Sequence, residues 1–137
     1  MEQTQTPKKI FIVDDDKYLL DMYTIKFKEK GFDVTQAVGS VDALSKLREG
    51  SDPDVLILDV VMPTMDGLEL LAIVKSEKLA PHAKIVVLSN LGQPSDIEKG
   101  RNLGANGYII KASATPSEIV EKVGIVLEGG EVFASVE

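Results

Sequence analysis

Apolar residues fall into two alternating patterns along the chain: short continuous runs, and longer segments whose apolar positions lie three or four residues apart. Continuous runs are typical of strands buried on both faces of a parallel sheet, and the spaced pattern is typical of amphipathic helices. The runs predict strands at residues 9–13, 33–37, 55–58, 84–88 and 106–110. A segment with helical spacing follows each of these runs.

The helical segments have recognisable starts and apolar faces. Asp16, Ser40 and Thr115 are predicted to cap helices, and Thr115 opens a capping box with Glu118 behind a proline at the first helical position. A short helix is predicted at residues 94–103. The apolar faces of the other four helices are predicted at Leu20, Tyr23 and Phe27; at Leu44 and Leu47; at Leu68, Leu71 and Val74; and at Ile119, Val123 and Val126.

This alternation of strands and helices predicts an α/β fold with a parallel sheet covered on both faces. Because crossover connections are right-handed, only a few strand orders are possible. We expect a flavodoxin-like, doubly wound five-stranded parallel sheet in the order 2-1-3-4-5 with five helices, an order taken from known doubly wound proteins. Residues 1–7 are expected to be a disordered N-terminus, 8–128 a single domain and 129–137 a short C-terminal tail.

Composition narrows the classes of function. The 137 residues carry a formal net charge of −7, which argues against direct binding of nucleic acid because such binding needs clustered Lys and Arg. Cysteine is absent from the sequence, so disulfides and thiol chemistry are excluded. No apolar run is long enough for a membrane span, and the polar start lacks the apolar core of a signal peptide. We expect a cytoplasmic protein with no membrane partner.

Polar side chains follow the predicted strands at the points where these end. Asp14 and Asp15 follow the first strand, Asp59 the third, Ser89 the fourth and Lys111 the fifth. Ligands of open α/β sheets bind outside the carboxyl ends of the strands, so these side chains are expected to converge. Carboxylates that lie close together repel one another unless a cation joins them, and hard oxygen ligands without Cys or His suit Mg²⁺. Such a set suits phosphoryl transfer, in which a carboxylate can be the nucleophile.

Taken singly, the same residues have ordinary structural interpretations. Asp59 and the Asp14–Asp16 cluster could be helix-entry residues. Ser89 could be a turn hydroxyl, and Lys111 could be a solvated loop lysine. Tyr108 could be half-buried strand packing. His82, the single histidine, is expected to lie on the solvated surface. The functional interpretation therefore depends on these residues occurring together.

The chain resembles the receiver domains of two-component response regulators, in particular those like the chemotaxis regulator. The resemblance covers about residues 8–128 and is carried by Asp14-Asp15, by Leu-Asp-Val-Val-Met-Pro-Thr-Met-Asp-Gly at 58–67, by Ser89 and by Tyr-Ile-Ile-Lys at 108–111. The stretch at 58–67 is highly specific. The other motifs are weak alone but fall at the expected strand ends.

The resemblance implies a phosphoprotein switch in a phosphorelay rather than a conventional enzyme. Asp59 is implied to accept a phosphoryl group from the phosphohistidine of a sensor histidine kinase or phosphotransfer protein, with slow self-catalysed phosphotransfer and dephosphorylation. Mg²⁺ is implied to bind Asp15, Asp59 and the backbone carbonyl of Val61, with Asp14 acting through water. Ser89 and Lys111 are implied to hold the phosphoryl oxygens. Tyr108 is implied to take part in the switch. Its ring is implied to turn inward and so to alter the face that a downstream protein effector binds.

Three positions depart from the family pattern. Ala112 stands where the family usually has a proline after the lysine, in a cis peptide. Asn90 follows the hydroxyl residue, where a small residue is frequent, and the hydroxyl residue is serine rather than threonine.

Three other classes of function fit the sequence less well: a phosphohydrolase, an FMN binder and an unreactive scaffold. An Mg²⁺-dependent phosphohydrolase with an Asp nucleophile usually has a second Asp two positions later, where this chain has Val61. A flavodoxin-like FMN binder would need a Ser/Thr/Gly-rich loop after the first strand, and the acidic cluster there would repel its phosphate. A scaffold of the same fold that never reacts is disfavoured by the complete set Asp15, Asp59, Ser89 and Lys111.

Overall fold

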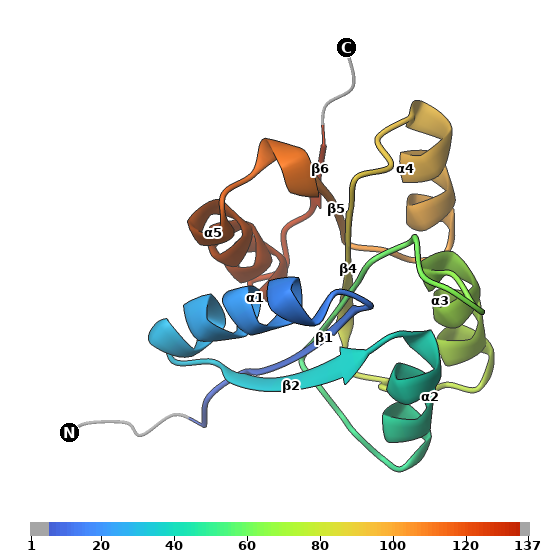
Figure 1. Cartoon of the computed structure of the whole chain (residues 1–137), viewed down its shortest axis with the longest axis horizontal. Helices are drawn as coiled ribbons and strands as arrows, with labels where there is room; N and C mark the ends of the chain where they lie inside the picture. The colour runs from blue at the N-terminus through green and yellow to red at the C-terminus, as the bar shows by residue number, and fades with distance from the viewer. Residues whose placement is uncertain (1–5, 135–137) are drawn as a thin grey trace.

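The computed structural model describes residues 6–134 and has the predicted α/β architecture. All strand pairs are parallel, and the sheet order is β2-β1-β3-β4-β5-β6 (Figure 1). The strands are β1 (Lys9–Asp14), β2 (Asp33–Val38), β3 (Val55–Leu58), β4 (Lys84–Ser89), β5 (Gly107–Ile110) and β6 (Val132–Phe133). The helices are α1 (Lys17–Glu29), α2 (Ser40–Arg48), α3 (Gly67–Ser76), α4 (Pro94–Asn102) and α5 (Pro116–Leu127), with a 3-10 turn η1 at Lys111–Ser113.

The core consists of two layers of apolar side chains, one on each face of the sheet. Phe11 and Val13 of β1 belong to the layer that packs under α2, α3 and α4. Ile10 and Ile12 of the same strand belong to the layer that packs under α1 and α5. The central strand β3 is buried along its whole length, as its continuous apolar run predicts. This burial fixes the position of Asp59, the residue directly after β3.

The predicted order 2-1-3-4-5 is confirmed for the first five strands. The segment predicted as a short tail adds a sixth, short strand to the edge of the sheet. Val132 and Phe133 of β6 pair with Gly107 and Tyr108 of β5. The Arg101 guanidinium lies 4.0 Å from the centre of the Phe133 ring, and β6 thereby contacts α4 as well as β5. A strand of two residues is too short to show an alternating pattern in the sequence, so only the folded edge of β5 reveals it.

Two of the predicted helix caps are confirmed and one is wrong. The Asp16 carboxylate accepts hydrogen bonds from the backbone at the start of α1, and Thr115 forms its capping box. The N-cap of α2 is Gly39, whose φ of 89° suits glycine, and Ser40 is the first helical residue. Within the described residues, the buried Ser40 hydroxyl has no hydrogen-bond partner. Asp66, which the sequence did not single out, forms a capping box at α3.

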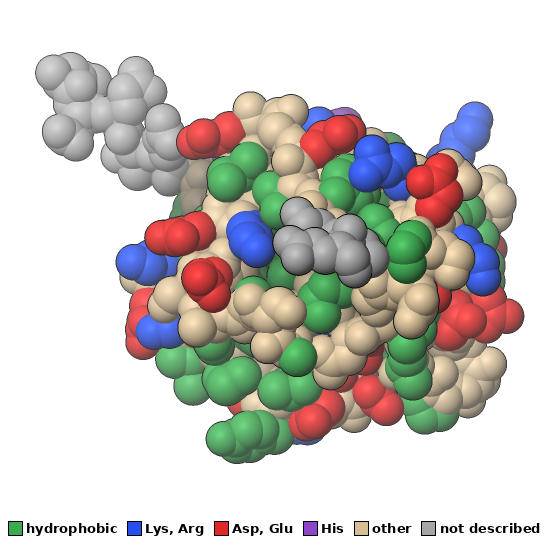
Figure 2. Space-filling model, turned by 90° about the horizontal axis from the view of Figure 1, so that it is seen from above, with side chains coloured by type: hydrophobic (Ala, Val, Ile, Leu, Met, Phe, Trp, Pro, Cys, Tyr) green, Lys and Arg blue, Asp and Glu red, His purple; other side chains and the backbone are tan. Residues whose placement is uncertain are grey.

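The surface carries charges of both signs. Figure 2 shows acidic, basic and apolar side chains interspersed over the face seen from above, rather than gathered into one basic patch. In the part of the chain that the structure describes, no helix combines the length and the apolar character that crossing a membrane requires.

Candidate functional site

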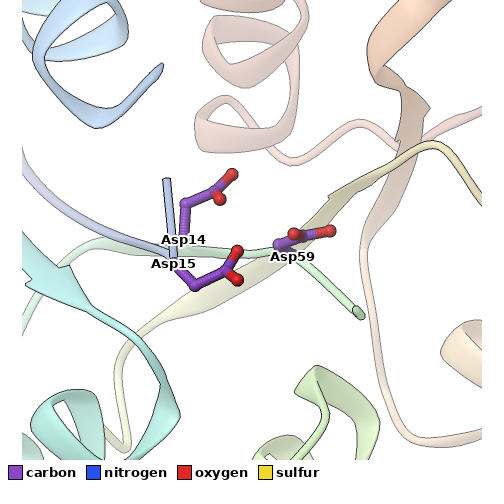
Figure 3. A group of neighbouring side chains, drawn as sticks. All are labelled: Asp14, Asp15 and Asp59. Atoms are coloured by element: carbon purple, nitrogen blue, oxygen red, sulfur yellow. The ribbon is translucent and has the colours of Figure 1, made fainter. Parts of the chain in front are cut away.

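The predicted carboxylates meet at the carboxyl edge of the sheet. Asp14 ends β1, Asp15 follows it, and Asp59 follows β3. They meet because β1 and β3 are paired neighbours, with Val13 opposite Leu58. One oxygen from each carboxylate lies within 4.8 Å of the others (Figure 3). Asp14 and Asp59 are buried, whereas Asp15 is exposed and opens the cluster to solvent.

Lys111 enters the cluster from the end of β5. Its Nζ lies 2.6 Å from Asp14 Oδ2 and 3.3 Å from Asp59 Oδ2. The Lys111 side chain is only 11 % exposed, so these ion pairs are largely shielded from water. The expected convergence of this lysine with the acids is therefore observed, whereas an interpretation as a solvated loop residue is wrong.

The electrostatic balance of the site disfavours the ionised form of Asp59. Burial raises the pKa of Asp59 above its usual range, the nearby Asp14 charge raises it further, and Lys111 opposes both effects. Burial alone would lower the pKa of Lys111, but its hydrogen bond to Asp14 and the charge of Asp59 outweigh it, so this pKa is raised. Lys111 is thus a permanent cation at neutral pH. One ammonium faces three carboxylates, and the remaining negative charge favours a divalent cation.

The donor set fits a hard metal ion. Asp14, Asp15 and Asp59 present carboxylate oxygens, which are the ligands that Mg²⁺ prefers, and the exposed Asp15 leaves room for retained water ligands. Val61 lies two residues beyond Asp59, and its side chain is 60 % exposed. Its backbone carbonyl as a further ligand stays a prediction.

The loop between β3 and α3 depends on a glycine that the sequence marked only as turn punctuation. The Gly67 N–H donates to the Val60 carbonyl at 2.8 Å. A Cβ at Gly67 would lie 1.9 Å from the Asp59 carbonyl oxygen, so any other residue would collide with the backbone that carries the central carboxylate. The Asp59 Oδ1 accepts from the Val60 N–H at 2.8 Å, which fixes the direction of this carboxylate. The Asp-Gly pair was the available signal, but it does not reveal this close approach.

Ser89 and Tyr108 lie together beside the loop after β4. Ser89 is fully buried, and its Oγ accepts a hydrogen bond from the Leu91 N–H at 3.1 Å. The Tyr108 ring is also fully buried, and its hydroxyl donates to the Leu91 carbonyl at 2.5 Å. Burial raises the pKa of Tyr108, and the charge of Asp96 adds to this effect. A Cβ at Gly100 would lie 3.1 Å from Tyr108 Cδ2, so this glycine makes room for the ring.

Tyr108 is therefore more buried than the alternative of half-buried strand packing implies. Its ring occupies the inward position in this structure. An inward turn of the ring therefore requires a state in which the ring lies outward, and this turn stays a prediction, as does the movement of Ser89.

Asn90 makes a contact that the sequence did not suggest. Its Oδ1 accepts a hydrogen bond from the Ala112 N–H at 2.9 Å. None of the peptide bonds in residues 6–134 is cis, so the bond from Lys111 to Ala112 is trans. Asn90 and Ala112, the two residues that depart from the family pattern at separate places in the sequence, are in contact in the fold.

His82 lies away from this site. Its side chain is 76 % exposed, and its Nδ1 lies 3.3 Å from Asp52 Oδ2. The expectation of a surface histidine is confirmed.

The chain matches one protein-family model and is similar to known proteins in both sequence and structure. The model of the response regulator receiver domain family matches residues 10–124. The chain is similar to Protein PilG of Pseudomonas aeruginosa, with 30% identity over 81% of this chain and 82% of that protein. It is also similar to the receiver domain protein (CheY-like) of Methanospirillum hungatei JF-1, whose crystal structure superposes with a TM-score of 0.80 at 30% identity over 90% of this chain and 95% of that one.

A further relative is longer than this chain. The chain is 32% identical to the alkaline phosphatase synthesis transcriptional regulatory protein PhoP of Bacillus subtilis over 93% of its own length. It spans only 51% of the length of that protein. The transcriptional activity that this name describes is a property of PhoP as a whole.

Proposed function

Because the chain belongs to the response regulator receiver domain family, we propose that it is a phosphoacceptor switch whose Asp59 takes a phosphoryl group from a phosphohistidine. The observation that carries this proposal is the meeting of Asp14, Asp15 and Asp59 with Lys111 at one edge of the sheet. The donor would be a sensor histidine kinase or a phosphotransfer protein. Such a switch performs phosphotransfer on itself and is not a conventional enzyme.

The reaction is a displacement at phosphorus. A carboxylate oxygen of Asp59 forms the new P–O bond while the P–N bond of the phosphohistidine breaks, and the imidazole leaves with the bonding electron pair and takes up a proton. The hydrogen bond from the Val60 N–H holds one Asp59 oxygen, which leaves the other oxygen as the nucleophile. This second oxygen, Oδ2, is the one that faces Lys111.

Lys111 and Ser89 are proposed to hold the transferred phosphoryl oxygens. The Lys111 ammonium already lies 3.3 Å from the reacting oxygen, and charge stabilisation of this kind is the main protein contribution to phosphoryl transfer. Ser89 is the last residue of β4, the strand that pairs with β3 on the side away from β1. Its Oγ accepts from the Leu91 N–H, so the hydroxyl can in addition donate its hydrogen to a phosphoryl oxygen.

Asp14, Asp15 and Asp59 would hold Mg²⁺, with the Val61 carbonyl as a further ligand and Asp14 acting through water. Bound there, Mg²⁺ would supply charge neutralisation for the incoming phosphoryl oxygens. The chain's own residues determine the selectivity of the site, because three carboxylates without sulfur or nitrogen donors disfavour softer metals.

The output of the switch is proposed to be the face formed by α4, β5 and α5. Ser89 and Tyr108 connect the phosphorylation site to this face through the loop that precedes α4. A downstream protein effector would recognise the face, and a coupling free energy of about 1–3 kcal/mol is typical of such switches. The net charge of −7 disfavours direct contact of this chain with nucleic acid.

Incubation with Mg²⁺ and a small phosphodonor such as acetyl phosphate tests the proposal. The intact mass of the purified chain should increase by one phosphoryl group, and a metal chelator should prevent the increase. An unchanged mass in the presence of Mg²⁺ would favour the alternative of a scaffold that never reacts.

A further inference from the structure

The loop that follows Ser89 and the turn that begins at Lys111 are joined by a hydrogen bond from the Ala112 N–H to Asn90 Oδ1 at 2.9 Å. Asn90 directly follows Ser89, and Ala112 directly follows Lys111. We propose that Asn90 is a positioning residue for Lys111, which it holds in place through the backbone of Ala112. The positioning role rests on the proposed function of Asp59.

The register of the sheet explains why this bond joins these two loops. β4 and β5 are paired up to Ser89 opposite Ile110, where both strands end. Beyond this pair the backbones diverge into the loop before α4 and into the turn η1. The amide oxygen of Asn90 spans the gap and so joins the two backbones just beyond the last strand pair. A proline at position 112 has no N–H and could not form the bond.

Among the described residues, one further backbone bond outside the strands involves the main chain of Lys111. The bond that closes the turn η1, from the Ala114 N–H to the Lys111 carbonyl, is long at 3.4 Å. At the side-chain end, Lys111 is held by Asp14 and Asp59. Asp59 is the group that changes in the proposed reaction, so its ion pair cannot hold the lysine constant during that reaction. The bond to Asn90 lies outside the reacting atoms and can persist throughout.

The rate of phosphorylation by acetyl phosphate with Mg²⁺ tests this role in four proteins: the parent, Asn90→Ala, Lys111→Ala and the double variant. Loss of one neutral hydrogen bond is expected to slow phosphorylation by about threefold to tenfold. If Asn90 acts through Lys111, the same substitution in the Lys111→Ala chain should change the rate by no more than about twofold, because the two effects are then non-additive. Ser113→Ala, at an exposed position of the same turn, is the matched control and should leave the rate unchanged.

Hydrogen exchange at the Ala112 amide provides a readout that does not depend on phosphorylation. Asn90→Ala should accelerate this exchange, whereas Ser113→Ala should not. Equal slowing by Asn90→Ala in both backgrounds would overturn the positioning role, since Asn90 would then act independently of Lys111. A faster reaction in Asn90→Ala would also overturn it, because the side chain would then merely restrict access of the donor. A parent chain that accepts no phosphoryl group would instead overturn the proposed function, and the positioning role with it.

Discussion

Asp59 is the residue at which stability and function conflict most directly. Its carboxylate is buried beside Asp14, and both burial and that charge raise its pKa. A raised pKa in an acid means that the folded state disfavours the ionised form, so ionised Asp59 destabilises the fold at neutral pH. This cost decreases as pH falls below the raised pKa and is gone below the ordinary pKa of the unfolded chain. Reactive groups are commonly kept in such unfavourable surroundings.

Asp59→Asn should therefore raise the melting temperature of the metal-free protein at neutral pH by a few degrees. The neutral amide has nearly the shape of the carboxylate and removes a disfavoured charge, while Lys111 keeps its closer partner Asp14. The measurement is thermal unfolding with a chelator present. Added Mg²⁺ should stabilise the parent through binding to the folded state and should stabilise the variant much less. A variant with a lower melting temperature than the parent would show that the Asp59 charge is compensated better than the geometry indicates.

The lifetime of phospho-Asp59 is also determined at the residue scale. The resemblance to receiver domains implies that the residues two positions after Asp59 and two after Ser89 flank the approach of the hydrolytic water. Here they are Val61 and Leu91, which are 60 % and 38 % exposed. Neither side chain can form a hydrogen bond, so neither can orient a water molecule. The phosphorylated chain should therefore lose its phosphoryl group slowly for this family.

The double variant Val61→Asn, Leu91→Glu should release phosphate faster than the parent. Help with proton transfer is worth about 10²–10⁴-fold in rate, and the gain here should be smaller because Lys111, in its proposed role, already stabilises the transition state. Phosphate release from the purified phosphoprotein with Mg²⁺ measures the effect. Val61→Ala, Leu91→Ala is the control for loss of apolar shielding. If both double variants match the parent, these two positions do not determine the lifetime.

Among the elements, α3 shows how a helix start supports the site. Its capping box at Asp66 and the close approach of Gly67 to the Asp59 carbonyl fix the loop that begins with Asp59. α5 contains a contrasting glycine, Gly124, for which an added Cβ would meet no atom within 4 Å.

Gly67→Ala should destabilise the fold by more than about 3 kcal/mol, since the new Cβ collides with backbone that cannot move without displacing Asp59. Gly124→Ala is the matched control and should stabilise the fold by about 0.5–1 kcal/mol through helix propensity. Urea unfolding of the two variants measures both effects. Similar unfolding free energies would mean that the loop after β3 can shift to accept a side chain.

Much at the element scale follows from the sequence. The apolar runs end in Asp59, Ser89 and Lys111, and a parallel sheet necessarily brings such ends to one edge. The helix start at Gly39 was missed because serine is normally the better N-cap. Here the backbone before α2 has a positive φ, which favours glycine at the N-cap position. The contact between Asn90 and Ala112 was not foreseeable, because it depends on where two loops diverge rather than on any local pattern.

At the scale of the whole molecule, β6 adds contacts to the face formed by α4, β5 and α5. The strand covers the edge of β5 (Figure 1). The Ala134 N–H donates to the Tyr108 carbonyl at 2.9 Å, and the Phe133 ring lies under the Arg101 guanidinium. The C-terminal segment thus contacts the backbone of the residue proposed to connect the phosphorylation site to its output. The sequence could not reveal this, because the strand has two residues and its partner edge is defined only by the tertiary fold.

Ending the chain at Gly130 should lower the free energy of unfolding by about 1–3 kcal/mol, the value expected for exposing two partly buried apolar side chains. Amide exchange along β5 should accelerate, because its outer edge loses a partner. The response to Mg²⁺ should persist, since the carboxylates lie at the ends of β1 and β3. Phe133→Ala is a milder control that keeps the backbone pairing. Unchanged exchange in β5 after truncation would show that β6 contributes little to this edge.

The most direct test of the central claim is to locate the phosphoryl group after reaction with acetyl phosphate and Mg²⁺. Borohydride reduction of the acyl phosphate followed by peptide mass analysis identifies the modified carboxylate. We expect a single modified residue, Asp59, in the parent chain and no modification in Asp59→Asn. Modification of Asp14 or Asp15 in the parent, or equal phosphorylation of the Asp59→Asn variant, would contradict this expectation.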